Sequence, residues 1–84
     1  MEKEKYYVYA IYSKKFNRIY IGLSNDPSRR LNEHNTGNVR PTKSYRPWQI
    51  IYKEFCGTRI QAREREKYYK TGYGREFIKQ YIPG

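Results

Sequence analysis

The sequence has little cysteine and no long apolar run, and both absences narrow the class of protein. Cys56 is its only cysteine, which excludes an internal disulfide framework and a cysteine-rich zinc site. No stretch approaches the ~20 apolar residues that a membrane-spanning helix needs. The first five residues are mostly charged and lack the apolar core of a signal peptide. We therefore expect a soluble, cytoplasmic protein with no membrane partner.

Acidic residues are also scarce, because 8 Asp and Glu stand against 18 Lys and Arg, giving a net charge of +10. A net charge this positive favours binding to a polyanion such as nucleic acid, since each phosphate that the protein neutralises releases condensed counterions. The 11 tyrosines add rings that can build a core and hydroxyls that can reach phosphate. Composition thus predicts one small domain, residues 1–84, that binds nucleic acid. A basic surface that serves only solubility, or one suited to ribosomal RNA or anionic lipid, is the alternative.

Apolar and β-branched residues predict three strands. Residues 6–12 and 18–23 are rich in Tyr, Ile and Val, and a short polar segment joins them into an antiparallel hairpin. Residues 48–55 form the third predicted strand. Gly22 is unfavourable inside a strand, so it indicates the close approach of a ligand or another backbone, or else a simple bulge. Tyr20 shares one strand face with Gly22.

Capping residues predict where the helices begin. Asn25 or Asp26 can cap a helix in which Pro27 takes the first position, and Thr58 with Gln61 has the pattern of a capping box. The remaining segments are a helix at 27–35, a polar and basic loop at 38–46, a helix up to about 70, a break at 71–74 and a short helix at 75–81. The order β-β-α-β-α-α predicts an α+β fold, a small three-stranded antiparallel sheet flanked by helices.

Glu66 is the most informative residue of the predicted second long helix. It falls on the same stripe as Ala62 and Tyr69, which is expected to pack on the sheet, whereas Glu64 points away as a surface charge. A carboxylate at the margin of a core needs an arginine, a hydrogen-bond network or a metal ion. Spacing alone favours a structural salt bridge and leaves a metal site as the alternative.

Arg30 and His34 are four residues apart and share one face of the first predicted helix. An arginine can hold a phosphate and stabilise the extra negative charge of a phosphoryl transition state. A histidine one turn away could bind a phosphate oxygen or orient a nucleophile. For a lone histidine at a helix end, a capping or surface role is the commoner alternative.

Together these residues resemble the GIY-YIG nuclease family over essentially the whole chain. Tyr20-Ile21-Gly22 matches the YIG element, and Tyr7-Val8-Tyr9 stands where the GIY element should be. Arg30 and His34 follow in the order of the family's helix pattern, and Glu66 resembles its metal-binding glutamate. The chain looks closest to the short stand-alone bacterial branch, which is similar to the N-terminal domain of the excision-repair nuclease. The Thr42-Lys43 pair and the segment 70–72 also resemble this branch.

The resemblance implies a metal-dependent DNA endonuclease, a hydrolase of repair or mobility. Glu66 would hold one divalent cation, Mg²⁺ with Mn²⁺ as a substitute. Tyr20 or Tyr9 would act on the attacking water, Arg30 would steady the phosphate, and His34 would assist positioning or proton transfer. The residues expected to contact nucleic acid are Gly22, Arg29, Lys43, Arg46 and Lys70.

Two positions depart from the family pattern. Tyr7 replaces the glycine of the first motif, and no clear counterpart of the family's C-terminal asparagine follows Glu66. Without an appended recognition domain, the contact with DNA is expected to be weak, salt-sensitive and tolerant of sequence. A non-catalytic nucleic-acid-binding module, or an interaction module that becomes a nuclease only with a protein partner, remains the rival interpretation.

Overall fold

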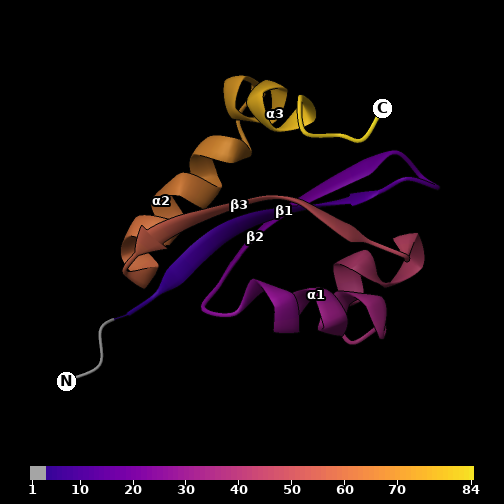
Figure 1. Ribbon diagram of the computed structural model, residues 1–84, viewed down its shortest axis with the longest axis horizontal. Helices are drawn as coiled ribbons and strands as arrows, with labels where there is room; N and C mark the ends of the chain where they lie inside the picture. Colours follow the sequence, from indigo (N-terminus) through magenta and orange to yellow (C-terminus); the bar gives the residue numbers. More distant parts are fainter. Residues whose placement is uncertain (1–3) are drawn as a thin grey trace.

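A computed structural model describes residues 4–84, in which three strands form one antiparallel sheet (Figure 1). The strands are β1 (Tyr6–Ser13), β2 (Arg18–Ser24) and β3 (Gln49–Gly57). Their spatial order is β2-β1-β3, so β1 pairs on both sides and β2 is an edge strand. The predicted α+β fold, with its antiparallel sheet and element order, is therefore confirmed.

The helices begin where capping side chains were predicted. Asp26 accepts a hydrogen bond from the backbone N–H of Arg29 and opens α1 (Pro27–Asn35). The capping box of Thr58 and Gln61 is present and opens α2 (Arg59–Tyr69).

Two predicted boundaries were wrong. The predicted loop at 38–46 contains a short 3₁₀ helix, η1 (Arg40–Tyr45), and α3 (Gly72–Lys79) begins before the predicted residue 75. The early start follows from the cap Thr71, whose hydroxyl oxygen accepts from the N–H of Gly74.

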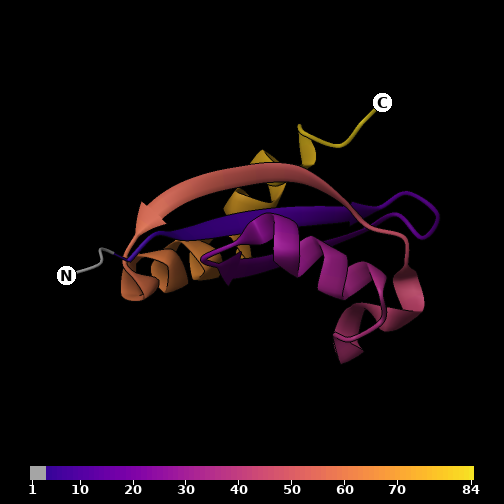
Figure 2. The ribbon, with the colours of Figure 1, turned by 60° about the horizontal axis from the view of Figure 1, so that its bottom comes forward.

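The sheet is covered on both faces by helices (Figure 2). Alternation along β1 sends Val8 and Ala10 to the face that α2 and α3 cover, and Tyr9 and Ile11 to the face of α1 and η1. The first cluster also contains Ile21, Ala62, Tyr69 and Ile78, and the second contains Trp48 with Tyr20, Leu31, Tyr45 and Ile50 at its margin. Within residues 4–84, no helix has the length and apolar character to cross a bilayer.

Gly74 marks the close contact between α2 and α3. A Cβ at this position would lie 2.6 Å from the Cα of Tyr69 and would also clash with the carbonyl of Tyr68. Because backbone atoms cannot move aside, we expect Gly74→Ala to lower the free energy of unfolding by about 3 kcal/mol. Gly72→Ala is the matched control in the same helix, since nothing lies within 4 Å, and it should change stability by less than about 1 kcal/mol. Urea unfolding of both variants measures the difference, and equal stabilities would contradict the assigned contact.

Candidate active site

Gly22 provides the space that the Tyr9 side chain occupies. The two residues are cross-strand partners on β2 and β1. A Cβ on Gly22 would lie 2.6 Å from Tyr9 Oη and 2.7 Å from its Cζ, so the phenol lies directly against the Gly22 backbone. The β1–β2 register continues through this pair without a shift, which excludes the bulge that was one explanation for the glycine. The close approach is made by a tyrosine side chain of the neighbouring strand.

His34 is fully buried between Tyr9 and Thr42. Its Nε2 lies 2.8 Å from Tyr9 Oη, and its Nδ1 lies 2.7 Å from Thr42 Oγ1. The Thr42 hydroxyl donates to the carbonyl of Val39, so its oxygen accepts from Nδ1–H and Nε2 accepts from the Tyr9 hydroxyl. The alternative of an ordinary surface histidine is therefore wrong, because the side chain connects a strand, α1 and η1.

Burial keeps both members of the Tyr9–His34 pair neutral. It lowers the pKa of His34 to about 4, with the nearby charge of Arg30 adding to the effect. It likewise raises the pKa of Tyr9 to about 12, with a further contribution from Tyr20, while Arg30 partly opposes the rise. At neutral pH the pair is thus a neutral hydroxyl donating to a neutral imidazole.

We expect this neutral histidine to make the fold sensitive to mild acid. The folded pKa lies below the ordinary value of 6.5, so the unfolded chain takes up a proton first and stability falls as the pH drops from about 6.5 towards 4. Between pH 7 and pH 5 the loss should be about 2 kcal/mol. His34→Gln should be less stable at pH 7 but should lack this slope. Urea unfolding at pH 7 and at pH 5 tests the expectation. An equal loss of unfolding free energy in the wild type and in His34→Gln would argue against it.

Tyr20 and Arg30 border the same pair. The Tyr20 ring is half-buried and meets the His34 imidazole edge-on, with ring centroids 5.1 Å apart. Arg30 lies close enough for its charge to act on Tyr9, and its Nη1 contacts Glu33 Oε1 at 2.8 Å. Four of the residues predicted from the sequence therefore lie together on the α1 face of the sheet.

Glu66 belongs to a different element from these four residues. Its helix, α2, packs on the opposite face of the sheet, yet the Glu66 charge contributes to the raised pKa of Tyr9, after the larger effects of burial and Tyr20. The side chain is only 16% exposed, and its two oxygens pair with Arg63 and Lys70, each at 3.3 Å. These ion pairs agree with the structural salt bridge that spacing favoured. Glu64 is exposed, as predicted.

The structure offers a metal ion few protein ligands at this point. No group of three or more His, Cys, Asp or Glu side chains that could hold an ion exists within residues 4–84. An ion bound by Glu66 would therefore have at most one further ligand of these types, and the nearby Lys70 would compete with it for the carboxylate oxygens.

The other residues predicted to bind nucleic acid are dispersed. Arg29 is exposed and pairs with Glu33 at 3.2 Å on its own helix. Lys43 is exposed on η1 and Arg46 follows directly, with Arg46 Nε donating to the Lys43 carbonyl at 2.8 Å. Lys70 therefore contacts Glu66, whereas the contacts of Arg29, Lys43 and Arg46 described here stay within their own segments.

Two residues that position the site received no role from the sequence. Thr42 fixes the His34 tautomer, although the family resemblance had singled out its position. Asn35 forms two hydrogen bonds with the backbone of Trp48, at 2.9 and 2.6 Å, and so joins the end of α1 to the start of β3. Neither contact has a local sequence signal, because each joins residues that only folding brings together.

Comparison with known proteins agrees with this geometry. Residues 5–81 match the GIY-YIG catalytic domain. A UPF0213 protein of Staphylococcus saprophyticus is 35% identical over 69 residues, which cover 81% of this chain and 83% of that protein. UPF0213 protein YazA of Bacillus subtilis is 34% identical over 71 residues, covering 83% of this chain and 71% of its own length.

A further relative, which matches a shorter part of the chain, is named as an endonuclease subunit. The structure-specific endonuclease subunit SLX1 homolog of Giardia intestinalis is 39% identical over 49 residues, which cover 55% of this chain and 14% of that protein. No solved structure gives a significant match. Because the family's domain spans nearly the whole chain and its motif residues surround one buried tyrosine–histidine pair, this protein belongs to the GIY-YIG family.

Proposed function

We propose that this protein is a metal-dependent endonuclease that hydrolyses phosphodiester bonds in DNA. The observation that carries the proposal is the position of Tyr20 and Arg30 beside the Tyr9–His34 pair, with the charge of Glu66 close enough to act on Tyr9. The half-exposed Tyr20 phenol can act on the water, and the Arg30 guanidinium can bind the phosphate. The Glu66 carboxylate can serve as a ligand for a cation. The family relationship supports nuclease chemistry at this group.

Arg30 is the residue that we assign to the scissile phosphate. Its side chain is 36% exposed, and its partner Glu33 lies on the same helix, so a phosphate can take over one side of the guanidinium fork. Charge that develops on the phosphoryl oxygens during attack strengthens this interaction in the transition state.

We assign the attacking water to Tyr20 and a positioning role to Tyr9. Tyr9 is 1% exposed, donates a hydrogen bond to His34, and has its pKa raised to about 12 by burial, so it is a poor partner for a solvent molecule. Tyr20 is half-buried and meets the same imidazole edge-on. The Tyr20 hydroxyl can therefore orient the water. The hydrogen bonds of His34 with Tyr9 and Thr42 fix the position of the imidazole that Tyr20 contacts.

Glu66 fits a divalent cation of the magnesium type. Mg²⁺ is commonly bound through one or two carboxylates, with phosphate oxygens and waters completing its shell, so a single carboxylate suffices once DNA is present. Arg63 and Lys70 are about half exposed and can turn from Glu66 towards the DNA backbone. When bound, the ion supplies Lewis acidity toward the scissile phosphate.

A non-catalytic nucleic-acid-binding module is the second candidate. It is favoured by the two cations that already neutralise Glu66. Incubation with supercoiled plasmid and with branched DNA, with and without Mg²⁺ or Mn²⁺, separates the two. A nicked product that requires metal supports the endonuclease. Binding without any product, on either substrate, would instead support the module, or a nuclease completed by a protein partner, as the word "subunit" in the Giardia relative's name suggests.

A further inference from the structure

Two cations hold the Glu66 carboxylate in the free protein. Arg63 Nε contacts Glu66 Oε1 and Lys70 Nζ contacts Glu66 Oε2, each at 3.3 Å, so both oxygens are engaged. Arg63 precedes Glu66 by three residues and Lys70 follows it by four, so the three side chains lie on one stripe of α2 and its C-cap. The Glu66 side chain is 16% exposed, whereas those of Arg63 and Lys70 are 49% and 51% exposed. The carboxylate is therefore largely covered, while Arg63 and Lys70, the cation pair, remain accessible to a ligand.

A DNA phosphate and a divalent cation make opposite use of this cluster. A phosphate is attracted by the guanidinium of Arg63 and the ammonium of Lys70, and it is repelled by the carboxylate. A magnesium-type ion needs the oxygens of Glu66, and it is repelled by the same two positive charges. Each ligand is thus disfavoured by the part of the cluster that the other ligand neutralises. Binding of the two ligands is therefore expected to be mutually favourable.

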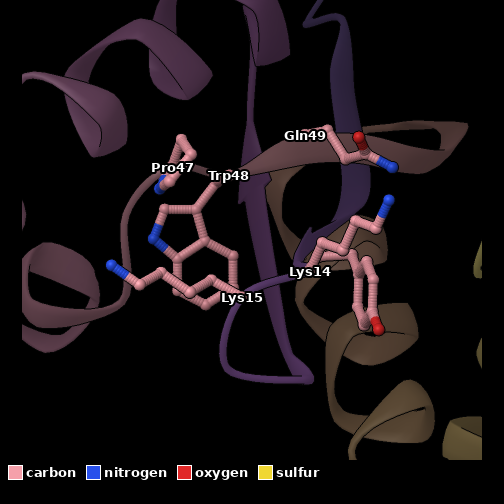
Figure 3. A pocket seen from close by; sticks show the side chains of 6 residues that line it. Lys14, Lys15, Pro47, Trp48 and Gln49 are labelled. Atoms are coloured by element: carbon pink, nitrogen blue, oxygen red, sulfur yellow. The ribbon is translucent and has the colours of Figure 1, made fainter.

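Lys14 and Lys15 show that pairing with a carboxylate is not general among the cations. They line a pocket of about 550 Å³ beside Trp48, at the end of the sheet that carries the β1–β2 turn, and their ammonium groups point to opposite sides (Figure 3). Within residues 4–84, neither lysine has a carboxylate within ion-pair distance. A phosphate that binds either lysine therefore releases no carboxylate. The cation pair differs, because its partner is the carboxylate that we assign to the ion.

We propose that DNA phosphates draw the cation pair away from Glu66 and so free the carboxylate for the divalent cation. This inference rests on the proposed function and describes how the same site is regulated. The free protein binds the ion weakly, because two positive charges lie against its ligand, and the DNA complex binds it more tightly. Since coupling between two ligands is reciprocal, the ion strengthens DNA binding by the same factor. Arg63, which received no role from the sequence, thereby has a double one.

Binding of Mn²⁺ to the protein without DNA tests the cation pair, and the loss of the EPR signal of free Mn²⁺ measures it. We expect Arg63→Gln and Lys70→Gln each to raise the Mn²⁺ affinity at least about fivefold, because each removes a positive charge 3.3 Å from a ligand oxygen. Lys67→Gln is the matched control. It removes the same charge beside Glu66 in the sequence, from an exposed side chain that is not an ion-pair partner of Glu66, and should change the affinity less than about twofold.

Two results of the Mn²⁺ titration would overturn the proposal. One is an equal change of affinity in Arg63→Gln, Lys70→Gln and Lys67→Gln, since net charge alone would then explain it. The other is the absence of Mn²⁺ binding in both variants of the cation pair, since the freed carboxylate would then hold no ion.

The affinity for DNA should move in the opposite direction. In EDTA, Arg63→Gln and Lys70→Gln should each weaken the binding of a short duplex at least about threefold, because a phosphate contact is lost and the carboxylate is less neutralised. Fluorescence anisotropy measures this affinity. A residue that only stabilises the helix would leave DNA binding unchanged, and a residue that only binds phosphate would leave Mn²⁺ binding unchanged. Either result would contradict the exchange.

The coupling itself is measured by adding Mn²⁺ to the DNA titration at constant ionic strength, with a gel confirming that the duplex is intact. Mn²⁺ should strengthen DNA binding at least about fivefold in the wild type and should give no such gain in Glu66→Gln. In the double variant Arg63→Gln/Lys70→Gln the carboxylate is already free, so the gain should be at least about threefold smaller than in the wild type. An equal gain in the wild type and the double variant would contradict the exchange.

Plasmid nicking separates this inference from the proposed function. If the wild-type protein nicks DNA with metal, but Arg63→Gln and Lys70→Gln bind Mn²⁺ with wild-type affinity, the exchange fails and the endonuclease stands. If the opposite changes in Mn²⁺ and DNA affinity appear without any nicking, the exchange stands as a property of a metal-binding nucleic-acid module, and the endonuclease proposal fails.

Discussion

Glu66→Gln is expected to reduce metal-dependent cleavage about a thousandfold and to leave DNA binding within about threefold. Glutamine keeps the size of the side chain, and its one carbonyl oxygen can still accept from Arg63 or from Lys70, which contact the two carboxylate oxygens at 3.3 Å. It removes the negative charge that the divalent cation needs, and within residues 4–84 no group of three or more His, Cys, Asp or Glu side chains could hold the ion in its place. Nicking of supercoiled plasmid in Mg²⁺ measures the first effect, and fluorescence anisotropy in EDTA measures the second.

Glu64→Gln is the matched control on the same helix, because that side chain is exposed and carries the same charge. It should retain cleavage within about twofold. Equal losses in the two variants would mean that net charge, and not a ligand at position 66, determines activity. A Glu66→Gln protein that cuts at the wild-type rate would remove Glu66 from the proposed site.

Gly22→Ala is expected to lower the free energy of unfolding by about 2 kcal/mol and to slow cleavage at least a hundredfold. The added methyl group would lie 2.6 Å from Tyr9 Oη, so the phenol must turn away and lose its 2.8 Å hydrogen bond to His34. The imidazole against which Tyr20 leans would then lose its fixed position. Denaturant unfolding and plasmid nicking measure the two effects.

A double-mutant cycle with Tyr9→Leu tests the cause. Leucine lacks the atoms that lie over position 22, so adding Gly22→Ala to Tyr9→Leu should cost less than about 0.5 kcal/mol in stability. Equal costs of Gly22→Ala in both backgrounds would show that the clash lies elsewhere, for example in the β2 backbone. If Gly22→Ala cleaves DNA at the wild-type rate, the Tyr9–His34 hydrogen bond is not required for activity.

The candidate site was partly predictable because several of its signals are local. Capping side chains at Asp26 and Thr58 determine where α1 and α2 begin, and they act within three residues. Likewise, side-chain alternation put Tyr20 and Gly22 on one strand face without knowledge of any partner. The 3₁₀ helix η1 was missed because its order comes from contacts with the elements on either side of it, such as those of Thr42 with His34 and with the Trp48 indole.

By itself, therefore, the sequence determined the basic character of the protein, the hairpin, the capped helices, the family and the residues around which a site could form. Each depends on composition, on spacing along one element, or on an ordered set of motifs. Only the tertiary structure decided that His34 is buried and accepts from Tyr9, that Gly22 leaves room for a phenol, and that the charge of Glu66, on a helix of the opposite face, acts on Tyr9. The physical reason is that burial, tautomer and steric clearance depend on atoms contributed by distant segments, and these meet only when the sheet and both helical layers pack together.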